Sequence, residues 1–170
     1  MGTVRPGWEG RFFEDFEVGD VYRCRYGRTV TEADNIQFTL LTNNTNQIHF
    51  NRDYASRTEW GQCLVNSALT LAIIAGMGVA DVSENGFALG WDQITLPNPV
   101  FAGDTLYSES EVTGTRESAS RPSQGIVTVE TRGYKQDGTL VIRYQRSVMV
   151  WKRAHAPAVN LFPDVDEHAG

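Results

Sequence analysis

Histidine, cysteine and positive charge are scarce in this chain of 170 residues, and each shortage narrows the possible functions. The formal net charge of -6 and the pI of about 5.0 argue against nucleic acid or an anionic membrane surface as the main partner. The two cysteines, Cys24 and Cys63, fit no paired metal-ligand spacing. We therefore expect reduced thiols, no metal site and a cytoplasmic location.

The chain also lacks a long apolar run. The longest, residues 68–80, is interrupted by Thr70, Gly76 and Gly78, so it is too short and too broken to span a bilayer. The first ten residues lack the apolar core of a signal peptide, and we expect none. With 41% hydrophobic residues and no internal repeat or linker, the sequence predicts one domain with a sizeable core.

Helices are predicted in the first half of the chain, after one strand over residues 21–30. Thr31 begins a helix as a capping-box variant, and this helix ends at an Asn-rich turn over residues 43–47. Asn51 caps a second, short helix. A third pattern, within residues 64–80, is apolar almost all the way round, which is typical of a buried helix.

Strands are predicted from residue 87 onward, over residues 87–96, 105–115, 125–135 and 139–152, and the last two form a hairpin around Asp137-Gly138. The sum is an α+β domain in which a curved antiparallel sheet wraps round a central apolar helix. We expect this domain to occupy residues 1–153 and an irregular tail to follow over residues 154–170.

His49 is the candidate for proton transfer near neutral pH. It is one of three histidines, and the other two, His155 and His168, fall in the expected tail. The polar turn before it and its large apolar neighbours predict a rigid mount for the imidazole. A lone histidine after a helix can equally be structural, and the pattern alone leaves both interpretations open.

The segment over residues 42–51, Thr-Asn-Asn-Thr-Asn-Gln-Ile-His-Phe-Asn, resembles the signature of the MaoC-like or (R)-specific enoyl-CoA hydratases, Ser-Gly-Asp-x-Asn-Pro-Leu-His-x-Asp. Residues 10–20, 99–106 and 120–129 fit the same family, so the resemblance covers roughly residues 10–153. It implies a hot-dog fold, in agreement with the sheet-round-helix pattern, and a homodimer or larger assembly.

The resemblance also implies roles for individual residues. In the family a His and an Asp hold the water that adds across the double bond of an enoyl thioester. His49 matches the His as the base, whereas Asn44 occupies the Asp position, where an amide can orient water but cannot transfer a proton. The backbone N–H of Ser67 matches the donor that stabilises the enolate-like thioester oxygen. Asn44 alternatively serves as the C-cap of its helix.

Three outcomes are open at the Asn44 position: His49 shuttles the proton alone, another carboxylate substitutes, or hydration has been lost. The loop is similar to an Asn-Thr-rich version in the branch of itaconyl-CoA and mesaconyl-CoA hydratases. That similarity favours the first outcome and implies a dicarboxylic acyl chain on the substrate.

Four further residues are candidates for substrate binding. Asn46 matches the family Asn and Asn66 begins the central helix, while Arg116 and Arg121 are candidates for the coenzyme A phosphates because guanidinium matches phosphate bidentately. The alternatives are structural: Asn66 and Ser67 cap the helix, and the two arginines belong to an exposed loop between strands.

The reaction that the resemblance implies is reversible hydration of a trans-2-enoyl-CoA to an (R)-3-hydroxyacyl-CoA, with no cofactor except coenzyme A as part of the substrate. Two other classes are open. A hot-dog thioesterase would hydrolyse the same thioesters, but that chemistry usually needs a carboxylate on the central helix, and residues 64–80 contain no acid. The other class is a non-catalytic acyl-CoA-binding protein.

Overall fold

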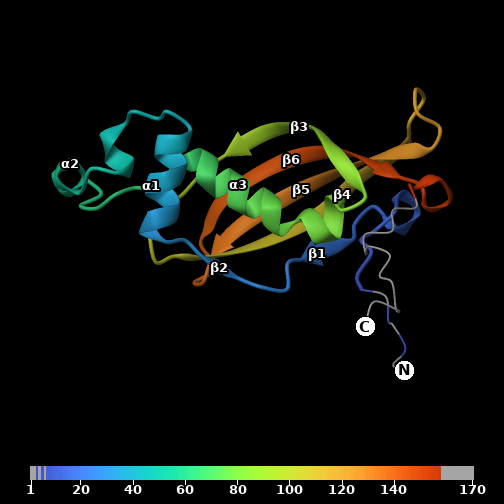
Figure 1. Ribbon diagram of the computed structural model, residues 1–170, viewed down its shortest axis with the longest axis horizontal. Coiled ribbons are helices and arrows are strands. Elements are labelled where there is room, and N and C mark those ends of the chain that lie inside the picture. Colours follow the sequence, from blue (N-terminus) through green and yellow to red (C-terminus); the bar gives the residue numbers. More distant parts are fainter. Residues whose placement is uncertain (1–2, 4, 6, 158–170) are drawn as a thin grey trace, which may run out of the picture.

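Six antiparallel strands form one curved sheet, and a central helix lies across its inner face (Figure 1). The computed structural model describes residues 3, 5 and 7–157. The strands are β1 (Val21–Arg23), β2 (Arg28–Thr29), β3 (Gly86–Thr95), β4 (Thr105–Glu117), β5 (Gln124–Lys135) and β6 (Leu140–Trp151). Their order is β1-β4-β5-β6-β3, with β2 also paired to β4, so β3 forms one edge of the sheet.

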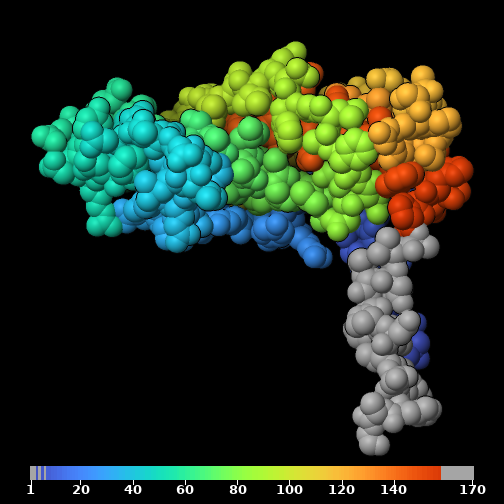
Figure 2. All heavy atoms as spheres, turned by 45° about the horizontal axis from the view of Figure 1, so that its top comes forward, coloured from blue at the N-terminus to red at the C-terminus, as the bar shows by residue number. Residues whose placement is uncertain are grey.

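Three α-helices and four short helical turns complete the described part of the chain. They are α1 (Glu32–Leu41), α2 (Arg52–Ser56), α3 (Ser67–Met77), η1 (Phe13–Asp15), η2 (Gln47–His49), η3 (Val79–Ser83, a π-helical turn) and η4 (Arg153–His155). Figure 2 shows α1 and α2 as a lobe that projects beyond one end of the sheet. None of the helices in this part of the chain is long and apolar enough to cross a membrane.

Helix α3 is held against the sheet by a close approach at Gly133. Ile74 of α3 is fully buried, and a Cβ atom on Gly133 of β5 would lie 2.8 Å from the Cδ1 atom of Ile74. The core around this contact contains Val30, Val65, Leu69, Ile73, Ile74, Met77, Val100, Leu106, Val141, Ile142 and Tyr144. The sheet-round-helix architecture predicted from the sequence is therefore confirmed.

Two details differ from the sequence predictions. The segment over residues 21–30 is broken into β1 and β2 rather than forming one strand. Helix α3 begins at Ser67, and its small residues Ala68, Ala72 and Gly76 are exposed, so the expected burial on every side is wrong for one face. The sheet covers a helix from one side alone, which leaves that face free. Of the expected tail, residues 158–170 lie outside the described residues, and the boundary at residue 153 stays a prediction.

The first turn of α1 is fixed by the expected capping box. The Thr31 hydroxyl accepts from the backbone N–H of Asp34 at 3.1 Å, and the Asp34 carboxylate accepts from the backbone N–H of Thr31 at 2.8 Å. Arg28 donates to the same carboxylate at 2.8 Å. The hydrogen bonds from Arg28, followed by those from Thr31, hold the pKa of Asp34 well below its usual range.

This depressed pKa predicts an acid-sensitive contribution to stability. An ionised Asp34 stabilises the fold above the ordinary carboxyl pKa of about 3.9, and the contribution is lost as pH falls below that value. We expect Asp34→Asn to lower the free energy of unfolding by about 1 kcal/mol at pH 7 and by less at pH 3, measured by urea denaturation. The control is Asp53→Asn on α2, where the side chain is 81% exposed. Parallel losses at both pH values would contradict the prediction.

Candidate functional site

The loop that carries His49 starts from a left-handed helix end. Asn43 has φ 54, and its backbone N–H donates to the Leu40 carbonyl at 3.1 Å, while the N–H of Asn44 donates to the Thr39 carbonyl at 3.0 Å. This pair of bonds is the Schellman ending, which normally places glycine at the left-handed residue and sometimes asparagine. It turns the chain sharply at the end of α1.

The amide side chains that follow hold the loop itself. The Asn44 Oδ1 atom accepts from the backbone N–H of Asn46 at 3.0 Å, and the Asn46 Oδ1 atom accepts from the N–H of Ile48 at 3.2 Å. Within the described part of the chain no hydrogen bond joins Asn44 to His49. Both asparagines predicted for the site therefore have a structural use in shaping the turn into η2.

The ring of His49 is buried, at 8% exposure, and is fixed by one carbonyl. The Nδ1 atom lies 2.9 Å from the Leu64 carbonyl oxygen. Because a carbonyl oxygen can only accept, Nδ1 must carry the proton, and in a neutral imidazole Nε2 then has the free lone pair. Among the described residues no carboxylate oxygen lies within 4.0 Å of either ring nitrogen. The arrangement offers one base and no acidic partner.

A buried amide ties this histidine to the start of α3. Asn35 of α1 donates from Nδ2 to the carbonyls of His49 at 2.7 Å and of Leu64 at 3.1 Å. Its Oδ1 atom accepts from the backbone N–H of Asn66 at 2.8 Å. Asn35 cannot be picked out from the sequence, because nothing local distinguishes it from an ordinary polar residue of a helix.

Asn66 caps α3 and leaves the N–H of the next residue without an acceptor among the described residues. Its Oδ1 atom accepts from the N–H of Ala68 at 3.0 Å, and its Nδ2 atom donates to the Thr39 hydroxyl at 3.3 Å. The N–H of Ser67 has no acceptor among the described residues, and Ser67 is exposed. The expected capping role of Asn66 is confirmed, and the Ser67 N–H is available to an oxygen atom from outside.

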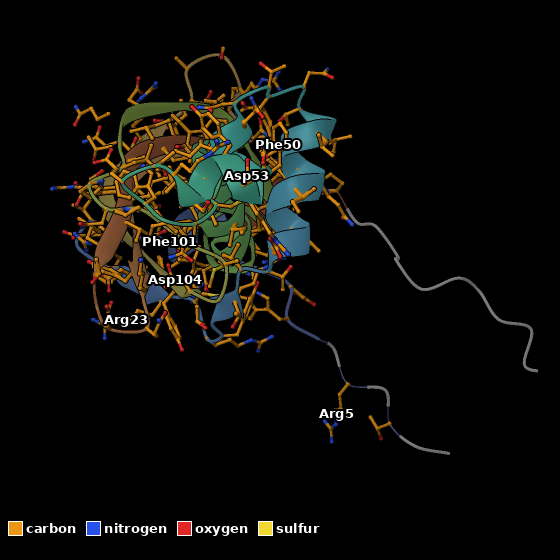
Figure 3. All side chains as sticks on the ribbon, turned by 90° about the vertical axis from the view of Figure 1, so that its left-hand side faces the viewer. Arg5, Arg23, Phe50, Asp53, Phe101 and Asp104 are labelled. Carbon is orange, nitrogen blue, oxygen red and sulfur yellow. The ribbon has the colours of Figure 1, made fainter. Side chains whose placement is uncertain are left out.

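A hollow of about 200 Å³ lies at this helix start. It is lined by Trp60, Leu64, Val65, Ser67, Thr70, Leu96, Pro97, Asn98, Pro99 and Val100, none of which carries a charge. Figure 3 looks onto this end of the molecule, with Phe50 and Asp53 on the side of α2 and with Phe101 and Asp104 in the segment after β3. The hollow is apolar with a few polar groups, as expected for a small-molecule site.

A neighbouring hollow of about 380 Å³ contains the Cys63 thiol, together with Glu32 and Arg52. These two charges form an ion pair with each other. Burial, with a smaller contribution from Glu32, raises the pKa of the Cys63 thiol. The thiol therefore stays protonated at neutral pH and offers no activated nucleophile.

The two candidate arginines lie at the other end of the molecule. Arg116 is near the end of β4, and Arg121 is in the loop that follows, where its guanidinium lies 5.6 Å from the ring centroid of Phe87 at the start of β3. In Figures 1 and 2 this loop is at the opposite end of the sheet from α1 and α2. One chain does not bring either arginine together with His49.

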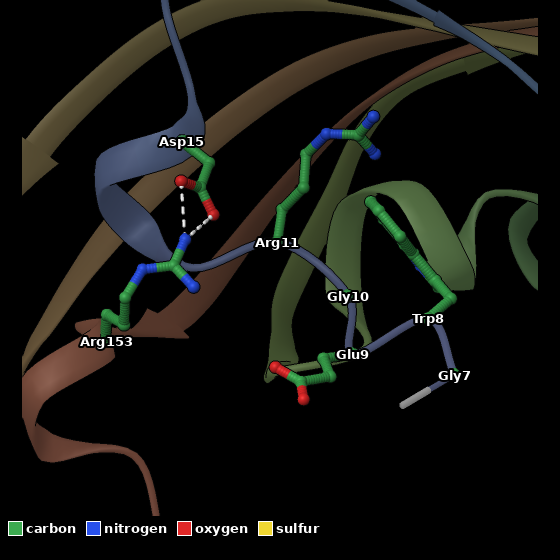
Figure 4. Close-up of a pocket in the computed structure, with 7 residues that line it drawn as sticks. All are labelled: Gly7, Trp8, Glu9, Gly10, Arg11, Asp15 and Arg153. Carbon is green, nitrogen blue, oxygen red and sulfur yellow. Dashed lines mark hydrogen bonds and ion pairs between the residues drawn. The ribbon is translucent and has the colours of Figure 1, made fainter. Parts of the chain in front are cut away.

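A third hollow, of about 470 Å³, lies beside the N-terminal segment and contains two further arginines (Figure 4). Arg153 donates to Asp15 at 2.6 Å, and Arg11 donates to Asp81 at 2.7 Å. Both guanidinium groups are therefore already neutralised. This hollow contains none of the residues that surround His49.

Comparison with known proteins decides the family. The family model for mesaconyl-CoA hydratase matches residues 5–160 of this chain. The chain belongs to the mesaconyl-CoA hydratase family. A curated relative, mesaconyl-CoA hydratase of Cereibacter sphaeroides, is 36% identical over 165 residues, which are 95% of this chain and 47% of the relative. The chain thus spans about half the length of that relative.

Solved structures agree with this family and its fold. The MaoC-like dehydratase of Rhodospirillum rubrum superposes with a TM-score of 0.75 at 27% identity, over 85% of this chain and 99% of that one. A Mycobacterium tuberculosis protein described as a double hotdog fold superposes with a TM-score of 0.78 at 19% identity, over 92% of this chain and 47% of that one. The expected MaoC-like family and hot-dog fold are both confirmed, and this chain forms one such unit.

Proposed function

We propose that this chain hydrates the double bond of an enoyl-CoA thioester, with His49 as its proton carrier. The observation that carries the proposal is the buried imidazole whose Nδ1 donates to the Leu64 carbonyl, so that Nε2 is left as the base. Membership of the mesaconyl-CoA hydratase family supports the reaction class. The uncharged hollow at the start of α3 supports an acyl-thioester substrate.

The chemistry needs one base and one hydrogen-bond donor. A water molecule held by Nε2 of His49 attacks C3 of the enoyl group and gives one of its two protons to Nε2. The negative charge moves through C2 to the thioester oxygen, where the free N–H of Ser67 stabilises it. The imidazolium then passes this proton to C2, while the other proton stays in the new hydroxyl group at C3. Both protons of water are thus accounted for. The step is redox-neutral, and we propose no cofactor beyond the coenzyme A of the substrate.

Asn44 takes no part in the proton transfer in this proposal. Its amide holds the turn that precedes η2, and no carboxylate replaces it near the ring in the described residues. Of the three outcomes open at this position, a His49 that works alone is the one we propose. The Asn46 amide, engaged with the N–H of Ile48, would hold the loop rather than bind substrate through that oxygen.

The size of the hollow favours a short acyl chain. Its volume of about 200 Å³ is below the ~300–1,000 Å³ typical of sites for drug-sized ligands. A carboxylate at the far end of a dicarboxylic chain would be costly to bury there without a cation, because the lining is uncharged. For a substrate of the itaconyl or mesaconyl type, the cation has to come from outside this lining.

A second copy of the chain would supply that cation. We propose a homodimer through the edge strand β3, whose large exposed residues are Phe87, Leu89, Trp91 and Ile94. The exposed face of α3 lies on the inner side of the same sheet, and two hot-dog units share one chain in the Mycobacterium tuberculosis protein. In a two-fold dimer the paired β3 strands run antiparallel. The start of one strand, with Phe87 and Arg121, then lies beside the end of the other.

In such a dimer Arg121 of the partner subunit approaches the hollow at Leu96 and Ser67, where it can bind a phosphate or carboxylate of the substrate. Arg116, on the last part of β4, is the second candidate at the same end of the sheet.

The free thiols of Cys24 and Cys63 support a cytoplasmic location.

His49→Ala tests the reaction. We expect the purified protein to hydrate short enoyl-CoAs, among them crotonyl-, mesaconyl- and itaconyl-CoA, faster than long ones, as followed by loss of enoyl-thioester absorbance. His49→Ala removes the base and should lower kcat by about 10²–10⁴-fold. Free thiol release in a colorimetric assay would instead indicate a thioesterase. Unchanged hydration by His49→Ala on every substrate would contradict the proposal.

Leu89→Asp tests the dimer, because it places a charge on the exposed edge strand. We expect sedimentation to report a dimer for the wild type and a monomer for this variant, with activity lost. Leu41→Asp, at an exposed position of α1, is the matched control and should stay dimeric. Arg121→Ala should stay dimeric while KM rises by about tenfold or more, the effect of a lost hydrogen bond to a charged group. A monomeric wild type with full activity would contradict the assembly.

A further inference from the structure

We propose that Asn35 is a positioning residue for hydration, setting both the orientation of the His49 ring and its placement relative to the Ser67 N–H. The inference rests on the function proposed above and assigns a role to a residue outside the family signature. It follows from the hydrogen bonds that the Asn35 amide makes with the backbone of three residues, His49 in η2 and Leu64 and Asn66 just before α3.

Asn35 is fully engaged although almost no water reaches it. Its side chain is 2% exposed, and its Nδ2 group donates at 2.7 Å to the His49 carbonyl and at 3.1 Å to the Leu64 carbonyl. Its Oδ1 atom accepts from the N–H of Asn66 at 2.8 Å. Both N–H donors and the oxygen are thus used, and every bond goes to backbone outside α1.

The hydrogen bond from Asn35 to the Leu64 carbonyl affects the hydrogen bond that holds the His49 ring. The Leu64 carbonyl oxygen accepts from both His49 Nδ1 and Asn35 Nδ2, so the two donors share one acceptor. An oxygen with a single donor would bind the Nδ1 proton more strongly. Asn35 therefore holds the acceptor in place and also limits the strength of its hydrogen bond to His49.

The bond to Asn66 acts on the second element of the site. Asn66 is the N-cap of α3, and the next residue supplies the free N–H of Ser67. One side chain thus connects the backbone of the base directly to the residue before the oxyanion donor. Since a misplacement of about 1 Å can cost ~10²-fold in rate, loss of this link should lower kcat more than it raises KM.

Asn35→Leu is the direct test, because leucine has a similar shape and makes none of the three bonds. We expect kcat to fall by about 10²-fold with KM within about threefold of wild type. The NMR resonance of the His49 Nδ1 proton should move downfield, because the Leu64 oxygen has lost its second donor and binds this proton more strongly.

Thr39→Val is the matched control. Thr39 is also fully buried on α1, one turn after Asn35, and its hydroxyl accepts from the Asn66 side chain without contacting His49 or Leu64. It should lose stability while kcat stays within about threefold and the resonance of the His49 Nδ1 proton stays unchanged. Equal effects of Thr39→Val and Asn35→Leu on kcat and on this resonance would overturn the positioning role.

Asn35→Asp covers the case in which Asn35→Leu does not fold. It keeps the side-chain shape and an oxygen towards the Asn66 N–H but loses at least one of the two donors, so kcat should fall and the resonance of the His49 Nδ1 proton should move downfield here as well. Unchanged kcat and an unchanged resonance in a folded Asn35→Asp would overturn the proposal. If the wild type hydrates no enoyl-CoA, the proposed function fails, and the comparison of Nδ1 proton resonances still decides whether Asn35 positions His49.

Discussion

The carbonyl oxygen of Leu64 is the acceptor on which the arrangement of the site depends. It receives one hydrogen bond from His49 Nδ1 at 2.9 Å and one from Asn35 Nδ2 at 3.1 Å. Since it cannot donate, it determines which ring nitrogen holds the proton and which is free for chemistry. It also lies three residues before the start of α3, so the same short segment joins α1, η2 and the central helix. His49, which we propose as the base, and Asn66, the residue before the proposed oxyanion donor Ser67, are in this way parts of one hydrogen-bonded unit.

The sheet supplies the rigid support for that unit. Close contact between Ile74 and Gly133 fixes α3 against β5, and the N-terminus of α3 is held as a consequence. His49, the proton carrier that we propose, and its Leu64 acceptor belong to one chain. The uncharged hollow beside it, the exposed face of α3 and the unpaired edge of β3 are features that a second copy would complete. A site shared between two copies would fit a family in which a curated relative is about twice as long as this chain.

Local patterns were enough to predict most of the fold, whereas the role of His49 as the base stays a prediction. The caps at Thr31 and Asn51, the four long strands and the mounted His49 all depend on residues close together in the sequence. Asn35 could not be predicted, because its partners lie 14 to 31 residues away and its role exists only after packing. The motif position of Asn44 suggested contact with water, whereas in the structure its Oδ1 atom accepts a hydrogen bond from the backbone of the turn.

The tautomer of His49 tests this account most directly, because every step of the proposed chemistry requires a free Nε2. A ¹⁵N NMR spectrum of the ring, recorded on the wild type at a pH where the imidazole is neutral and assigned with the help of a His49→Ala variant, measures it. The account predicts a protonated, hydrogen-bonded Nδ1 and an unprotonated Nε2. A neutral ring protonated at Nε2, with Nδ1 bearing the lone pair, would contradict it.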